Sequence, residues 1–212
     1  MLKHLLPILA LGAVISSCST TRVVKPLKRG DWEVGANYGG PYVNSGMLPM
    51  TGLYFAHGSR DHISIFGGVQ TTTMAFNTLQ LDFGVCHLIT NQNGLKPGIS
   101  LNAVINPMIG FRDASFRLYP ELTPNFYWDL DPEGKHLVYG GFTNWFDPTY
   151  GKAVYEKGKL WHPALNVGYK LNLPKFTASI EGKWLNYNKQ LSIPQATVNS
   201  INGNGGLGIY AG

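Results

Sequence analysis

Apolar and small polar residues alternate along most of this chain, and this alternation constrains the fold more than any other feature. In segment 79–86, the odd positions are Leu, Leu, Phe and Val, whereas the even positions are Gln, Asp, Gly and Cys. A period of two residues puts successive side chains on opposite faces of a β-strand, whereas a helix needs a period near 3.6. The pattern therefore predicts an all-β chain.

Ten segments show this alternation, some of them weakly. They cover residues 31–38, 51–57, 62–69, 79–86, 99–106, 116–130, 136–146, 161–172, 176–184 and 205–211. The 26 glycines and the 12% of aromatic residues also favour strands and tight turns. We expect an antiparallel up-and-down β-barrel of about ten strands within residues 30–212.

The connections between these segments alternate in length. Short ones fall at 58–61, 91–97, 131–135 and 173–175, and longer ones at 39–50, 70–77, 107–115, 147–159 and 187–204. Short turns at one end and long loops at the other are typical of outer-membrane barrels, in which the turns face the periplasm.

The two faces of the expected strands differ in a way that favours a membrane barrel. One face is mostly Gly, Ser, Asn, Thr and Gln, and charged residues are only 14% of the chain. The other face is apolar, with rings near the strand ends; these are Trp32, Trp128, Tyr169 and Phe176 at one end, and Tyr38, Trp161 and Trp184 at the other. Such rings fit two interfacial girdles around a lipid-facing surface. A soluble barrel with its apolar face inward is the competing interpretation.

Three prolines conflict with the expected strands. Pro120, Pro124 and Pro163 lie within or beside them, and proline cannot donate a ladder hydrogen bond. Segment 116–130 is therefore the least regular of the ten.

The N-terminus has the pattern of a processed export signal. Lys3 precedes an apolar stretch at 5–15, which is too short to span a bilayer as a helix. The sequence Ile-Ser-Ser-Cys that ends at Cys18 resembles a bacterial lipobox. The resemblance implies a signal peptide at 1–17, acyl chains such as palmitate on Cys18, and a tether at 18–29. Ser19 in place of Asp implies the outer membrane, and Cys86, left without a partner, is expected to be buried.

Four charged residues fall on the polar face of the expected strands: Glu33, Asp82, Glu181 and Lys183. A charge inside a narrow lumen is costly unless it is paired. We expect either a salt-bridge network that stiffens the barrel or a polar path and small-ligand site.

Two short motifs support different functions. His62-x-Ser64 resembles the pair used by outer-membrane lipid A deacylases, which implies acyl transfer with His as base and Ser as nucleophile, although no Glu follows at a comparable spacing. Gly30-Asp31-Trp32 resembles the Gly-x-Trp motif of lipocalins, which implies ligand binding by a periplasmic lipoprotein.

Taken together, the chain resembles the small outer-membrane β-barrel lipoproteins of Gram-negative bacteria, of the Bacteroidota type. The resemblance implies a non-enzymatic structural or accessory subunit, or a narrow channel, with outer-membrane lipid and an outer-membrane protein as partners. The 17 basic residues form no cluster, so we expect no nucleic-acid partner. The scattered histidines and the missing phosphate and dinucleotide motifs predict no metal site and no cofactor. The lipocalin-like protein and the lipid A-modifying enzyme remain as alternatives.

Overall fold

The structure is a computed structural model, and it describes residues 23–43, 46–47, 49–112, 114–148, 160–185, 192–193, 196–197 and 206–211. The expected signal peptide and Cys18 lie outside the described residues, as do loop residues 149–159.

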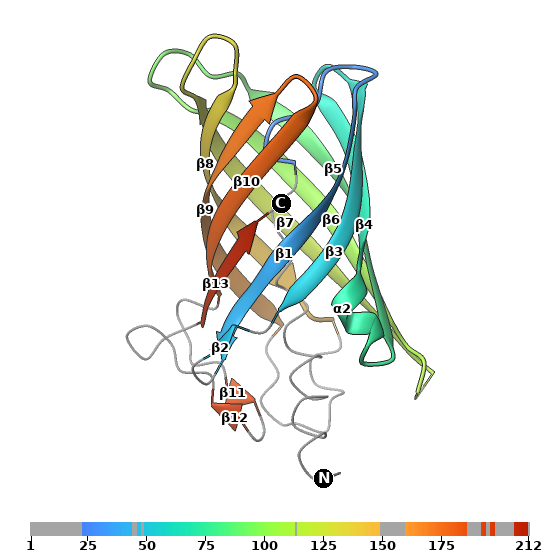
Figure 1. Cartoon of the computed structure of the whole chain (residues 1–212). Coiled ribbons are helices and arrows are strands. Elements are labelled where there is room, and N and C mark those ends of the chain that lie inside the picture. The colour runs from blue at the N-terminus through green and yellow to red at the C-terminus, as the bar shows by residue number, and fades with distance from the viewer. Residues whose placement is uncertain are drawn as a thin grey trace.

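The described part of the chain confirms the all-β antiparallel barrel. The strands are β1 (Trp32–Val43), β2 (Gly46–Met47), β3 (Met50–Arg60), β4 (Ile63–Gln70), β5 (Thr78–Thr90), β6 (Gly98–Gly110), β7 (Ser115–Asp129), β8 (His136–Phe146), β9 (Trp161–Leu173), β10 (Phe176–Leu185) and β13 (Gly206–Ala211), with a separate hairpin of β11 (Ser192–Ile193) and β12 (Ala196–Thr197). Each long strand pairs with its neighbour in sequence order, and the strands run obliquely around the barrel (Figure 1).

The ring is closed by β13, which pairs with β10 over Ile180–Leu185 and with β1 over Tyr38–Pro41. Among the described residues, the eleven-stranded sheet thus contains a ring of ten strands, because β2 pairs with β1 alone. This matches the even number expected from the alternation.

The connections lie between the expected segments, with two corrections to the long loops. The loop expected at 39–50 is shorter, because β1 continues to Val43 and residues 46–47 form β2. The turn at 111–114 between β6 and β7 was expected as a long loop at 107–115, but both strands run further than the pattern indicated, and Pro107 stays within β6, where it pairs with Leu118. The connection from β4 to β5 contains α2 (Thr71–Met74), and no helix in the described ranges is long and apolar enough to cross a membrane.

The strand prolines lie where a ladder stops or is interrupted. Pairing of β7 with β8 ends at Glu121, next to Pro120, and skips Thr123 and Pro124, which lie between the paired residues Leu122 and Asn125. Pro163 lies one residue beyond the last β9 position that pairs with β10. Each missing N–H therefore falls beside a ladder position that is already unpaired, which lets the strand continue.

Burial in this barrel is reversed relative to a water-soluble protein. The inward side chains include Asn37, Gln70, Gln80, Asp82, Ser100, Asn102, Asn106, Thr123, Asn125, Thr143, Asn166, Glu181 and Lys183, all buried. The exposed strand positions include Trp32, Val34, Leu53, Phe55, Ile65, Phe83, Val85, Ile105, Leu122, Phe126, Leu165, Val167, Phe176 and Ile180. Thus, along the strands whose side chains are described, the polar face points into the barrel and the apolar face points out.

Inside the barrel, four aromatic rings lie against glycines of the adjacent strand. The register pairs Tyr54 with Gly35, Phe66 with Gly84, Tyr127 with Gly98 and Tyr139 with Gly168. A Cβ added at any of these glycines would come within 2.8 Å of the partner ring. The rings thus fill the lumen across the space that glycine leaves.

We expect Gly98→Ala to destabilise the barrel by about 1–3 kcal/mol, the usual effect of overpacking. The added Cβ would lie 2.2 Å from the Tyr127 ring, which is fully buried and cannot move aside. Urea unfolding of the detergent-refolded protein measures the change. Gly94→Ala is not a suitable control, because Gly94 has a positive φ, whereas Gly140→Ala meets no atom closer than 3.4 Å. Equal stability of the Gly98 and Gly140 variants would contradict the packing argument.

Candidate functional site: the lumen and its N-terminal segment

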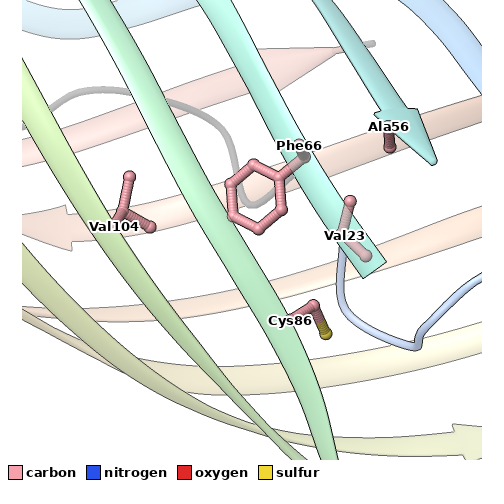
Figure 2. Packing of buried hydrophobic residues seen from close by; sticks show 5 residues of the cluster. All are labelled: Val23, Ala56, Phe66, Cys86 and Val104. Carbon is pink, nitrogen blue, oxygen red and sulfur yellow. The ribbon is translucent and has the colours of Figure 1, made fainter. Parts of the chain in front are cut away.

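The N-terminal segment 23–28 does not hang free as a tether but lies inside the barrel. Val23 and Val24 are each only 2% exposed. Val23 packs with Ala56, Phe66, Cys86 and Val104, which come from four strands of the wall (Figure 2). Val24 packs in a second cluster, with Tyr127, Leu137 and Tyr139. This segment, which we call the luminal segment, fills the part of the lumen nearest the short turns.

Hydrogen bonds fix the luminal segment through its backbone. The Val23 carbonyl accepts from Asn102 Nδ2 at 2.9 Å, and the Val24 carbonyl accepts from the Ser100 hydroxyl. The Leu27 N–H donates to Ser64 Oγ at 2.8 Å. The wall residues are Ser or Asn, so the polar face that the alternation predicted here binds a peptide backbone.

At the rim, the chain passes close to the wall before it enters β1. The Gly30 N–H donates to the Gly58 carbonyl at 2.7 Å. A Cβ on Gly58 would lie only 1.9 Å from the Lys28 carbonyl oxygen, so this approach requires glycine.

An ion pair joins the luminal segment to the mouth of the barrel. Lys25 Nζ lies 2.6 Å from Asp129 Oδ2, in a half-exposed position. Gln92, in the turn between β5 and β6, holds Asp129, since its Oε1 accepts from the Asp129 N–H and its Nε2 donates to the Asp129 carbonyl. An open pocket of about 640 Å³ surrounds this pair and is also lined by Lys28 and Glu133.

The net free energy that holds the luminal segment is small. Burial of the two valines contributes about 3–5 kcal/mol, and the three hydrogen bonds add about 1 kcal/mol each. Ordering the six residues 23–28 costs about 1–2 kcal/mol per residue. The two sides nearly cancel, so the segment is bound only marginally.

Of the four charged residues expected in the lumen, two form a buried pair. Lys183 and Glu181 are 1% and 2% exposed, with Nζ and Oε1 3.9 Å apart. The Tyr139 hydroxyl is hydrogen-bonded to Glu181. Asp82 is buried on β5.

Glu33 has a partner that the sequence analysis did not name. Its carboxylate lies 2.9 Å from Lys170 Nζ and accepts a hydrogen bond of 2.9 Å from the Tyr54 hydroxyl. Lys170 is on the polar face of β9, in step with Asn166 and Gly168, and this alternation could have identified it. The contact joins β1 to β9 across the inside of the wall.

The residues of the two short motifs do not form the sites that their resemblances imply. Ser64 points into the lumen, where its hydroxyl oxygen accepts a hydrogen bond from the Leu27 N–H. His62 is exposed, and the centroid of its ring lies 5.7 Å from that of the His87 ring. Trp32, of the lipocalin-like motif, is exposed on the outer surface and stacks on His57. Cys86 is a buried free thiol of the Val23 cluster.

The turn between β7 and β8 depends on Asp131. Its carboxylate accepts from the backbone N–H groups of Lys135, at 3.0 Å, and His136, at 2.6 Å. These hydrogen bonds favour the ionised form and lower the pKa of Asp131 below its ordinary value.

We therefore expect this turn to loosen in acid. A carboxyl whose pKa is lowered by folding contributes stability above the unfolded pKa, near 4, and loses it as the pH falls through the folded pKa. The protection factors of the Lys135 and His136 amides against hydrogen exchange, relative to the intrinsic rate at each pH, should fall over that range. In Asp131→Asn the protection should be lower at neutral pH and should lose its acid-dependent step. If Asp131→Asn keeps the acid-dependent step in hydrogen exchange, a titratable group other than Asp131 causes that step.

The comparisons with known proteins add no identification: no family model, no curated protein and no solved structure matches this chain. Within the described ranges, no group of three or more His, Cys, Asp or Glu side chains could hold a metal ion.

Proposed function

We propose that this protein is a non-enzymatic, membrane-spanning β-barrel lipoprotein of the bacterial outer membrane, anchored also through acyl chains on Cys18. It acts as a structural or accessory subunit whose lumen is closed in the state described. Its partners are outer-membrane lipid and an outer-membrane protein.

The observation that carries this proposal is the reversed burial of the strands. Apolar side chains such as Val34, Phe83 and Val167 are exposed on the outer wall, while amides and a charge pair are buried inside. In water, such an outer surface would be a large apolar patch, which monomeric soluble proteins rarely expose. In a bilayer the same surface faces lipid, and the ladders between neighbouring strands pair the backbone along most of the ring.

The filled lumen favours a structural or accessory role over a permanently open channel. The four aromatic rings, the Glu181–Lys183 pair and the luminal segment occupy the interior. A lipocalin-like role needs an interior that receives a ligand, and here polar side chains and the chain itself fill that space. The deacylase-like role needs His62 and Ser64 in one site, and they point to different environments.

A membrane-extraction experiment tests the proposal. The Cys18→Ala protein lacks the lipid anchor, so only the barrel can hold it in the membrane. We expect it to resist carbonate and urea washes and to migrate faster unboiled than boiled on a gel, because a closed barrel stays compact in detergent. If the washes release the Cys18→Ala protein and its gel mobility does not depend on heating, the barrel is soluble, and only the acyl chains on Cys18 hold the unaltered protein to the membrane.

A further inference from the structure

We propose that the luminal segment, residues 23–28, is a removable plug, and that its withdrawal turns the closed barrel into a narrow pore lined by polar and apolar side chains. This inference rests on the proposed membrane barrel. It adds a gated pathway to a protein that otherwise has only a structural or accessory role.

The way in which the plug is bound makes it separable from the wall. The wall strands are joined by their own ladders, and none of those ladders includes residues 23–28. The plug is instead held by side-chain groups of Ser64, Ser100 and Asn102, which bind its backbone. Hydroxyl and amide groups form equally good hydrogen bonds with water, so these residues remain satisfied when the plug leaves.

The lumen around the plug is suited to water. Asn102 Oδ1 and Asn125 Oδ1 are buried and make no hydrogen bond in the described structure, on residues that are more than nine-tenths buried. Asn102 itself binds the plug, and Asn125 Nδ2 donates to Ser100, which also binds it. Buried polar atoms of this kind are normally satisfied by ordered water. Removal of the plug therefore uncovers polar groups that bind water beside the apolar side chains that contact the two valines.

A latch at the barrel mouth holds the plug in place. Lys25 on the plug pairs with Asp129 at the end of β7. Gln92, in the turn between β5 and β6, forms two hydrogen bonds with the Asp129 backbone. The ion pair faces the open pocket at the mouth, so it is within reach of solvent and salt. An exposed pair of this kind is weak and is screened by ions. The latch can therefore open while the wall stays intact.

The native thiol of Cys86 allows a direct test, because Val23 lies beside it in one cluster (Figure 2). All variants carry Cys18→Ala, which leaves Cys86 as the remaining cysteine. Val23→Cys, oxidised or bridged with a short thiol-specific cross-linker, ties the plug to β5, and mass spectrometry verifies the link. The matched control is Val23→Cys with Cys86→Ala, which cannot form the link.

Planar-bilayer recording in potassium chloride then measures opening. We expect Asp129→Asn, and replacement of residues 23–28 by a Gly/Ser segment of equal length, to raise the time spent conducting at least tenfold over the parent. The linked Val23→Cys protein should be silent, and cleavage of the disulfide should restore opening. The control variant should not respond to oxidant or reductant.

Gel mobility separates failure of the plug from failure of the barrel. A Gly/Ser variant that keeps the heat-dependent mobility shift but conducts no more than the parent overturns the plug proposal. Equal conductance of linked and unlinked Val23→Cys protein also overturns it. If no variant or parent shows the shift, the membrane barrel itself is rejected. Asp129→Asn is the milder change and tests the latch if the Gly/Ser variant does not fold.

Discussion

Replacing Lys183 by Met should lower the free energy of unfolding by about 3–5 kcal/mol, the largest single-residue effect that we expect. The substitution leaves Glu181 buried in the lumen without its cation, which is 3.9 Å away in the native protein. The hydrogen bonds from the Tyr139 hydroxyl and from Asn166 Nδ2 remain, but neutral donors do not replace an ammonium group. The cost comes from the stranded carboxylate, because the methionine has nearly the same length as the lysine that it replaces.

A second variant separates the lost charge pair from a packing defect. Adding Glu181→Gln to Lys183→Met should recover most of the loss, since no unpaired charge then remains. Lys175→Met, in the exposed turn between β9 and β10, is the matched control and should change stability by less than about 0.5 kcal/mol. Urea titration in detergent micelles measures all three variants. If the double variant is as unstable as the single one, the loss is a packing effect and the pair is not the cause.

Replacing Ile105 by Arg on the outer wall should cost about 2–4 kcal/mol when the barrel is folded into lipid vesicles. Ile105 lies in the middle of β6 and is 48% exposed. If lipid covers that surface, a guanidinium there meets hydrocarbon. If water covers it, an exposed substitution changes stability by less than about 0.5 kcal/mol.

Leu95→Arg provides the reference for that experiment. Leu95 is 95% exposed in the short turn between β5 and β6, outside the wall that we assign to the membrane. The Leu95 variant should match the parent in both vesicles and micelles, whereas the Ile105 variant should lose stability in vesicles. Equal stability of the two variants in vesicles would mean that the middle of β6 does not face lipid.

The strands could be predicted because a single rule governs the wall. Every wall residue faces either the lumen or the outside, so the alternation alone located β5 and β6 to within a few residues. The end of β6 was placed too early, because the strand continues through Pro107, at a point where its register with β5 is interrupted between Ile105 and Met108. That register is visible only in three dimensions.

The site was harder to predict than the wall. Lys183 and Glu181 share a face at a spacing of two residues, so their pairing follows from one strand. The partner of Glu33 is 137 positions away; the alternation of β9 places Lys170 in the lumen, but it does not pair that lysine with Glu33. The luminal segment was expected to be a tether because residues 23–28 have no alternation and bind through their backbone, which leaves no trace in the side-chain pattern.

The position of β13 has a consequence for the order of assembly. It joins the first wall strand to one of the last, so the ring closes between residues separated by most of the sequence. The luminal segment leads into Trp32 at the start of β1, whereas β13 pairs with Tyr38–Pro41 further along that strand. The three wall residues that bind the segment come from β4 and β6, so its binding surface can form before β13 docks. Entry of the segment through the open side before docking avoids threading it through a finished ring. Slow docking of β13 would therefore give the segment time to find its place, and a barrel closed too early would trap it outside.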